Sequence, residues 1–190
     1  MTTRTSARRS RFALAGAIAA TVAAVGLVTG SAMASPAADP AAPGTHVPAT
    51  IEPAECESIP PDRDLAVTQT VHQVGLDLGA SDKVMLAAFE AGWVESHMNN
   101  LPCGDKDSLG VFQQRPSQGW GTPEEIMDVT YAATQFFEQA IHNEPLYPDL
   151  TAGLLAQTVQ RSCCPERYDE AEPKALEMLA EVGALSSRER

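Results

Sequence analysis

Glu95 has the sequence context of a general acid. It lies near the end of a segment of small and apolar residues, and a loop rich in Gly, Pro and Asn begins a few residues later. Apolar burial, the negative carboxyl end of a helix dipole and nearby carboxylates would each raise the pKa of such a carboxyl group. A carboxyl that stays protonated near neutral pH can protonate the leaving oxygen of a glycosidic bond. The sequence context of Glu95 therefore favours cleavage of a glycosidic bond in a sugar chain.

Glu90 is the rival of Glu95 for this role. The two residues are five positions apart, so at ~100° per residue their side chains point ~140° apart on a helix, and only one can face a cleft. We favour Glu95, because it adjoins the loop and is followed by Ser96. If Glu90 is buried it needs a partner, for which Arg115 and Arg161 are the candidates.

A hydrolase would need a second carboxylate or a positioned water beside the acid. Asp105 and Asp107 are the nearby candidates, but their Cys-Gly-Asp-Lys-Asp-Ser setting is also typical of a turn, which is the interpretation we favour. His97, two residues after Glu95, could assist acid–base chemistry. A histidine at a helix end more often stabilises the helix dipole, and we favour that role here.

Aromatic and amide side chains in the loop could contact a sugar. Trp120 follows a glycine, and its flat indole ring would suit the face of a pyranose, whereas Trp93 lies inside the helical segment and is expected in the core. The run Gln113-Gln114-Arg115 could bind carbonyl or lactyl groups of a substrate or satisfy the loop backbone, and the sequence does not decide between these roles.

Apolar residues recur at helical spacing through most of the chain beyond residue 62. Capping residues and glycines set the expected ends of the helices. The expected elements are a helix from Asp62 to Leu78 ended by Gly79, a helix 82–97 capped by Ser81, a loop or small hairpin 99–121, a Thr122-Pro123-Glu125 capping box, a helix from Asp128 to His142, a loop 143–150, a helix 151–161 capped by Thr151, and a last helix from Pro165 to about Val182. The predicted fold class is all-α, or mostly α with a small hairpin.

The amino-terminal segment resembles an export leader. Basic residues at positions 4, 8, 9 and 11 precede an uncharged run from Phe12 to about Gly30, and Ala-Met-Ala then predicts cleavage after Ala34. The alternative is a retained membrane anchor, although the run is weakly apolar for a permanent span. Residues 35–61 are rich in Ala and Pro and predict a flexible linker. We place the catalytic domain at 62–185.

Removal of the leader would leave nine basic and 25 acidic residues, a net charge of −16. Such a chain is a poor binder of polyanions, which argues against nucleic acid as a partner but says little against a neutral glycan. We expect no cofactor, no metal and no membrane contact after cleavage of the leader, and a secreted monomer.

Four cysteines follow the leader, at Cys56, Cys103, Cys163 and Cys164, and predict two disulfides in an exported chain. We expect Cys56 and Cys103 each to meet one of the adjacent pair, or to meet each other. A bond between Cys163 and Cys164 is the least expected pairing, because neighbouring cysteines close a strained ring.

The segment around Glu95 resembles the soluble lytic transglycosylase and goose-type lysozyme group of the lysozyme-like superfamily. The motif of this group is Glu-Ser at a helix end, then Ser-x-Gly-hydrophobic-hydrophobic-Gln, then Pro three residues later. It stands here as Glu95-Ser96, 108–113 and Pro116. Residues 107–121 also resemble a segment found in actinobacterial exported proteins. The resemblance spans about 67–179, but residues 155–162 lack the Tyr-Asn of the group's corresponding helix.

This resemblance implies a lysozyme-like helical domain that cuts peptidoglycan glycan strands, with Glu95 protonating the bond after N-acetylmuramic acid. It also implies that one side chain orients the acid and another lines the cleft, namely Ser96 and Gln113. The full set of expected substrate-binding residues is Ser96, Ser108, Gln113, Gln114 and Trp120. A non-catalytic wall-binding or regulatory domain with the same fold is the alternative, and a purely structural, disulfide-bonded exported protein is the least favoured reading.

Overall fold

The computed structural model describes residues 54–188. Helices make up 62% of this part of the chain and no strand occurs in it, which confirms the expected all-α class. The predicted leader 1–34 and residues 35–53 of the predicted linker lie outside the described residues. No helix of the described part is both long and apolar enough to cross a membrane.

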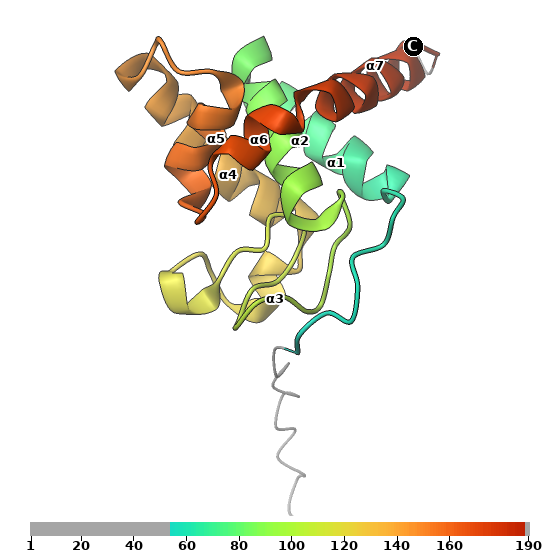
Figure 1. Cartoon of the computed structure of the whole chain (residues 1–190). Coiled ribbons are helices and arrows are strands. Elements are labelled where there is room, and N and C mark those ends of the chain that lie inside the picture. Colours follow the sequence, from blue (N-terminus) through green and yellow to red (C-terminus); the bar gives the residue numbers. More distant parts are fainter. Residues whose placement is uncertain (1–53, 189–190) are drawn as a thin grey trace, which may run out of the picture. The chain divides into compact units, whose positions relative to one another are not determined.

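Seven α-helices and two short 3₁₀ helices follow one another along this part of the chain (Figure 1). The α-helices are α1 (Leu65–Asp77), α2 (Asp82–Ser96), α3 (Pro123–Ile126), α4 (Val129–Asn143), α5 (Ala152–Gln160), α6 (Glu166–Glu170) and α7 (Glu172–Arg188), and the 3₁₀ helices are η1 (Pro116–Gln118) and η2 (Glu144–Leu146).

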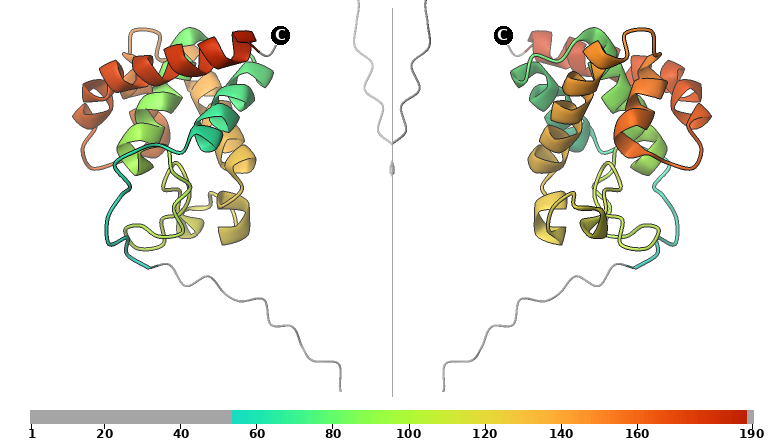
Figure 2. Two further views of the ribbon diagram at one scale, coloured as in Figure 1. Left: turned by 90° about the vertical axis from the view of Figure 1, so that its right-hand side faces the viewer. Right: turned by 90° about the vertical axis from the view of Figure 1, so that its left-hand side faces the viewer.

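Helix α2 is the centre of the domain, because nine of its 15 residues are buried and it contacts α1, α4, α5, α6 and α7. Its sequence is apolar on most sides, as expected for a helix surrounded by others. Figure 2 shows α7 lying across one end of the helices, while α3 and the loop after α2 form the opposite end. The carboxyl end of α2 therefore points toward an irregular loop region.

Side-chain caps fix where most helices begin. The hydroxyls of Ser81 and Thr151 accept hydrogen bonds from the backbone of the first turns of α2 and α5, and the carboxylate of Asp128 does the same for α4. Thr122 and Glu125 form the predicted capping box at the start of α3. Helix α1 begins later than predicted, because the carboxylate of Asp64 caps it.

The predicted last helix is instead two helices, α6 and α7, joined at Ala171. Pro173 explains the break, because its ring would clash with the carbonyl four residues earlier if the helix of α6 continued through it. In the second position of α7 the missing N–H of proline costs nothing. The loop 99–121 contains no strand, and its one hairpin-like pairing is a single antiparallel bridge between Leu109 and Gln114.

The last residues of the predicted linker are attached to the domain. Ala54 pairs with Cys103 in an isolated bridge, and a disulfide joins Cys56 to Cys103. This pairing was one of the two expected alternatives. The second disulfide joins Cys163 to Cys164, the pairing that was the least expected from the sequence.

Loss of the Cys56–Cys103 bond is expected to destabilise the domain. The bond spans 47 positions, and closing a loop of that length should stabilise the fold by about 2–4 kcal/mol through the unfolded state. Denaturant unfolding of Cys56→Ser/Cys103→Ser should show this loss. The matched double variant Cys163→Ser/Cys164→Ser should change the unfolding free energy far less, since its loop is minimal, and equal losses in the two variants would contradict the argument.

Candidate active site

Glu95 lies in the last turn of α2, half-buried, at the junction of α2, α5 and α6. The hydroxyl of Tyr168, a fully buried residue of α6, donates a hydrogen bond of 2.5 Å to Oε1 of Glu95. Burial raises the pKa of Glu95 above its ordinary value. Hydrogen bonds from Tyr168 and Gln160 and the positive charge of Arg167 offset part of that rise. The carboxyl is thus both desolvated and held in place.

Tyr168 was missed by the sequence analysis. It is 73 residues from Glu95 in the chain, and no local motif marks it. Gly153 in α5 makes the approach of α6 possible, because a Cβ there would lie 2.5 Å from the backbone nitrogen of Asp169. Burial next to Glu95 raises the pKa of the Tyr168 hydroxyl, so this group stays a hydrogen-bond donor across the physiological range.

Gln160 connects the site to the loop after α2. Its amide Nε2 donates a 2.7 Å hydrogen bond to the carbonyl of Phe112, and the same side chain also acts on Glu95. The carboxyl end of α5 and the loop therefore meet at the acid.

Ser96 is fully buried and fastens α2 to this loop. Its hydroxyl donates to the carbonyl of Val111 at 2.7 Å and accepts a hydrogen bond of 3.1 Å from the backbone of Asn99. The Ser96 hydroxyl thus both donates and accepts a hydrogen bond inside the protein. The expectation that Ser96 contacts a substrate is corrected to a structural role next to the acid.

Ser108, Gln113 and Gln114 also hold the loop together. Ser108 and Gln114 are almost fully buried, and the Gln114 amide donates to the carbonyl of Ala132 in α4 at 3.1 Å. Gln113 donates to the carbonyls of Cys103 and Gly110, both at 3.1 Å. Burial removes Ser108 and Gln114 from the surface that a glycan could reach, so the expectation of substrate contacts is corrected for both. Gln113 keeps a half-buried side chain.

Gln113 and Asp105 line a common pocket of about 300 Å³ next to the Cys56–Cys103 disulfide. Glu55 and the apolar side chains of Ile59 and Leu101 complete much of its wall. Asp105 is exposed there, with Lys106 at 3.6 Å. Glu95 is not among the residues that line this pocket, so the structure does not bring Asp105 to the candidate acid.

Asp107 has a structural setting. Its carboxylate accepts hydrogen bonds from the backbone of Ser117 at 2.8 Å and from Nε of Arg115 at 2.6 Å. Hydrogen bonds from Ser117 and Arg115 hold the pKa of Asp107 far below its usual value. A carboxylate with these partners fastens the loop, in agreement with the turn role favoured from the sequence.

His97 and the two tryptophans pack at the edge of the core. The His97 ring stacks on Trp93 with centroids 4.2 Å apart, and its Nδ1 lies 2.8 Å from the carbonyl of Pro60. Trp93 is half-buried rather than central. Trp120 is also half-buried and packs against the core.

Glu90 is only 1% exposed, and its Oε2 has no hydrogen-bond partner among the described residues. The predicted arginine partner is wrong, because Arg115 pairs with Asp107 and Arg161 is exposed. Burial first, then the nearby charges of Asp169 and Glu172, raise the pKa of Glu90 to about 8. Helix α2 therefore carries two carboxyl groups with raised pKa values, and only Glu95 has a hydrogen-bond donor beside it.

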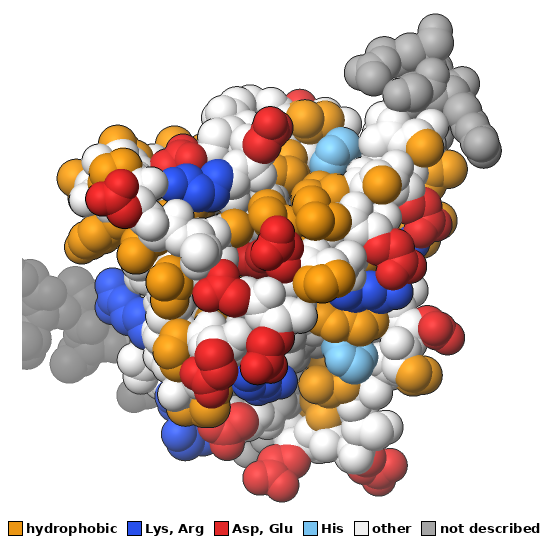
Figure 3. Space-filling view, turned by 45° about the horizontal axis from the view of Figure 1, so that its top comes forward, with side chains coloured by type: hydrophobic (Ala, Val, Ile, Leu, Met, Phe, Trp, Pro, Cys, Tyr) orange, Lys and Arg blue, Asp and Glu red, His pale blue; other side chains and the backbone are white. Residues whose placement is uncertain are grey.

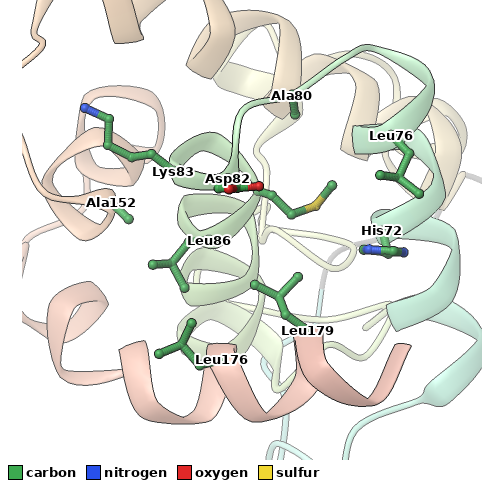
Figure 4. A pocket seen from close by; sticks show the side chains of 10 residues that line it. His72, Leu76, Ala80, Asp82, Lys83, Leu86, Ala152, Leu176 and Leu179 are labelled. Carbon is green, nitrogen blue, oxygen red and sulfur yellow. The ribbon is translucent and has the colours of Figure 1, made fainter. Parts of the chain in front are cut away.

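A cavity of about 570 Å³ in the described part is lined by residues that do not include Glu95. Leu86 of α2, Leu176 and Leu179 of α7 and Leu76 of α1 make it mainly apolar (Figure 4). In Figure 3 acidic side chains are scattered among apolar ones on the face that includes α7. Within residues 54–188, no three His, Cys, Asp or Glu side chains are grouped so as to hold a metal ion.

No protein-family model matches the chain, and no curated protein is significantly similar to it. The chemistry of Glu95 and its neighbours is therefore the basis for a functional assignment.

Replacing Tyr168 with Phe should raise the pKa of Glu95 further, because the lost hydrogen bond favours the ionised carboxylate. NMR titration of the Glu95 side-chain carboxyl carbon in both proteins measures this shift directly. Tyr131→Phe on α4 is the matched control, since no hydrogen bond joins Tyr131 to Glu95 in the structure. An unchanged or lower pKa in Tyr168→Phe would show that the tyrosine does not act on the acid.

Glu90 should make the stability of the domain fall as pH rises. Its pKa is about 8 when folded against 4.5 ordinarily, so the folded state keeps a proton that the unfolded chain releases. Its contribution is full below about pH 4.5 and is lost progressively up to about pH 8. Denaturant unfolding at both ends of this window should show a smaller drop for Glu90→Gln than for wild type, by on the order of 1–3 kcal/mol. An equal drop in the unfolding free energy of the two proteins between these pH values would contradict this role of Glu90.

Proposed function

We propose that the chain cleaves the glycan strands of peptidoglycan, with Glu95 as the general acid. The observation that carries the proposal is the setting of Glu95, where burial favours the protonated carboxyl and Tyr168 donates to Oε1 at 2.5 Å. A carboxyl that keeps its proton at higher pH can deliver it to a glycosidic oxygen. The loop that would receive a substrate begins at the same end of α2.

The resemblance of residues 95–116 to the lytic transglycosylase and goose-type lysozyme motif supports the same assignment, and under the proposal the helical domain is lysozyme-like. Ser96 supports it in a different way from that first expected. By holding the carbonyl of Val111 at 2.7 Å, it fixes the loop against the helix end that bears the acid. A fixed loop keeps the acid and a bound sugar in a constant relative position. Such positioning supplies a large part of enzymatic rate enhancement.

The carboxylates near the loop favour a one-acid mechanism over hydrolysis with two carboxylates. Asp107 is engaged by Ser117 and Arg115, and Asp105 lines a pocket whose lining residues do not include Glu95. In the resembled transglycosylases one glutamate acts first as acid and then as base, and the muramic 6-hydroxyl closes an anhydro ring. We propose this outcome, which mass spectrometry of wall digests would distinguish by anhydro rather than reducing muramic ends.

A non-catalytic wall-binding or regulatory domain is the second candidate function. It is favoured by one observation, that the side chains lining the cavities described above do not include Glu95. In that case the acid would serve only the packing of α6 against α2.

Glu95→Gln should reduce muropeptide release from purified cell walls by at least about 100-fold, the usual contribution of a general acid. Glu90→Gln is the matched control, because it makes the same change at another buried carboxyl of α2 and should keep near-wild-type release. Both variants should still sediment with insoluble walls. Release by Glu95→Gln at the wild-type rate would refute the catalytic role, and wall binding without turnover by the wild type would support the second candidate.

A further inference from the structure

The disulfide between Cys163 and Cys164 lies in the five-residue connection between α5 and α6. Their Cα atoms are 3.8 Å apart, closer than the about 4.4–6.8 Å of most disulfides, because the two residues are neighbours across one peptide bond. A loop of two residues restricts the unfolded chain very little. The bond therefore acts mainly on the local structure of the connection.

This connection joins the two side chains that act on Glu95. Gln160 is the last residue of α5, and Tyr168 lies in the first turn of α6. Both helices hold the backbone between them. The Gln157 amide donates to the carbonyl of Ser162 at 3.0 Å, and the backbone of Arg167 donates to the carbonyl of Cys164 at 3.2 Å.

Ser162 couples the cysteine pair to α5. Its hydroxyl accepts a 3.3 Å hydrogen bond from the backbone of Cys164 and donates a 3.2 Å hydrogen bond to Oε1 of Gln157. A change in the conformation of Cys163 and Cys164 would thus act on Ser162 and on the start of α6 together.

The pair is also accessible. Cys163 is exposed and Cys164 half-buried, whereas Cys56 and Cys103 are both half-buried and close a much longer loop. Disulfides that are exposed or strained are the ones that exchange readily with thiols.

We propose that Cys163–Cys164 is a thiol-exchange site that controls the contact between Tyr168 and Glu95. In the oxidised protein the ring restricts the connection and keeps α6 in place. A dithiol reduces the pair, the connection gains backbone freedom, and Tyr168 loses its fixed position on the acid. As regulation of glycan cleavage, this inference rests on the proposed function.

The thiol–disulfide exchange takes place in two steps. A thiolate of the dithiol attacks Sγ of the exposed Cys163, the sulfur–sulfur bond breaks, and the sulfur of Cys164 leaves as a thiolate that takes up a proton. The second thiol of the reductant then attacks the mixed disulfide and releases Cys163 as a thiol. The dithiol becomes a disulfide, and its two electrons reduce the cysteine pair.

Thiol labelling during a dithiothreitol titration of the folded protein tests the first part, with peptide mass spectrometry identifying the labelled cysteines. Cys163 and Cys164 should be half-labelled at a dithiothreitol concentration at least about 10-fold lower than Cys56 and Cys103. Labelling of all four cysteines together, or of Cys56 and Cys103 first, would overturn the proposal.

NMR titration of Glu95 before and after reduction tests the second part. Reduction should raise the pKa of Glu95, as loss of the tyrosine hydrogen bond does. Cys56→Ser/Cys103→Ser should respond in the same way, whereas Cys163→Ser/Cys164→Ser should already resemble the reduced protein and ignore dithiothreitol. A pKa of Glu95 that does not change on reduction would overturn the proposal.

Muropeptide release measured in the same two states separates this inference from the proposed function. No release in either state, together with a reduction-dependent pKa of Glu95, would refute glycan cleavage while supporting the exchange site. Release that depends on Glu95 but is identical in both states would refute the regulatory role alone.

Discussion

The hydrogen bond from Tyr168 to Glu95 connects the central helix to the last part of the chain. Without it, α6 would present a buried phenol with no partner at the end of α2, and a buried polar group without a partner is costly. The bond therefore helps to decide how α6 packs, and the same packing desolvates the carboxyl. One interaction thus serves both the fold and the proposed chemistry.

The two glutamates of α2 show how environment separates similar groups. Glu90 is more buried than Glu95 and lies near two further carboxylates, Asp169 and Glu172, with no donor to its Oε2. Its protonated form fits the interior but has no route to a substrate. Glu95 is half-buried, accepts a hydrogen bond from the Tyr168 hydroxyl and lies where α2 meets the loop. A raised pKa is typical of functional sites, but geometry and access decide which of two such groups can react.

Features that depend on neighbouring residues could be predicted from the sequence. Ser81, Thr122 and Thr151 cap helices through hydrogen bonds to groups three residues away, so their spacing alone located the helix starts. The position of Glu95 at a helix end followed from the same local pattern. Tyr168 could not be found in this way, because its contact joins residues 73 positions apart. The roles of Ser96 and Gln114 were also misjudged, since whether a polar side chain points inward depends on tertiary packing.

The central claim is that the folded protein keeps the carboxyl of Glu95 protonated above the ordinary range of a glutamate. NMR titration of the wild-type protein, with the side-chain carboxyl carbons of Glu90 and Glu95 assigned, tests it most directly. Both carboxyls should titrate above the ordinary value of 4.5. A Glu95 that titrates at or below that value, like an exposed side chain, would contradict its role as a protonated acid.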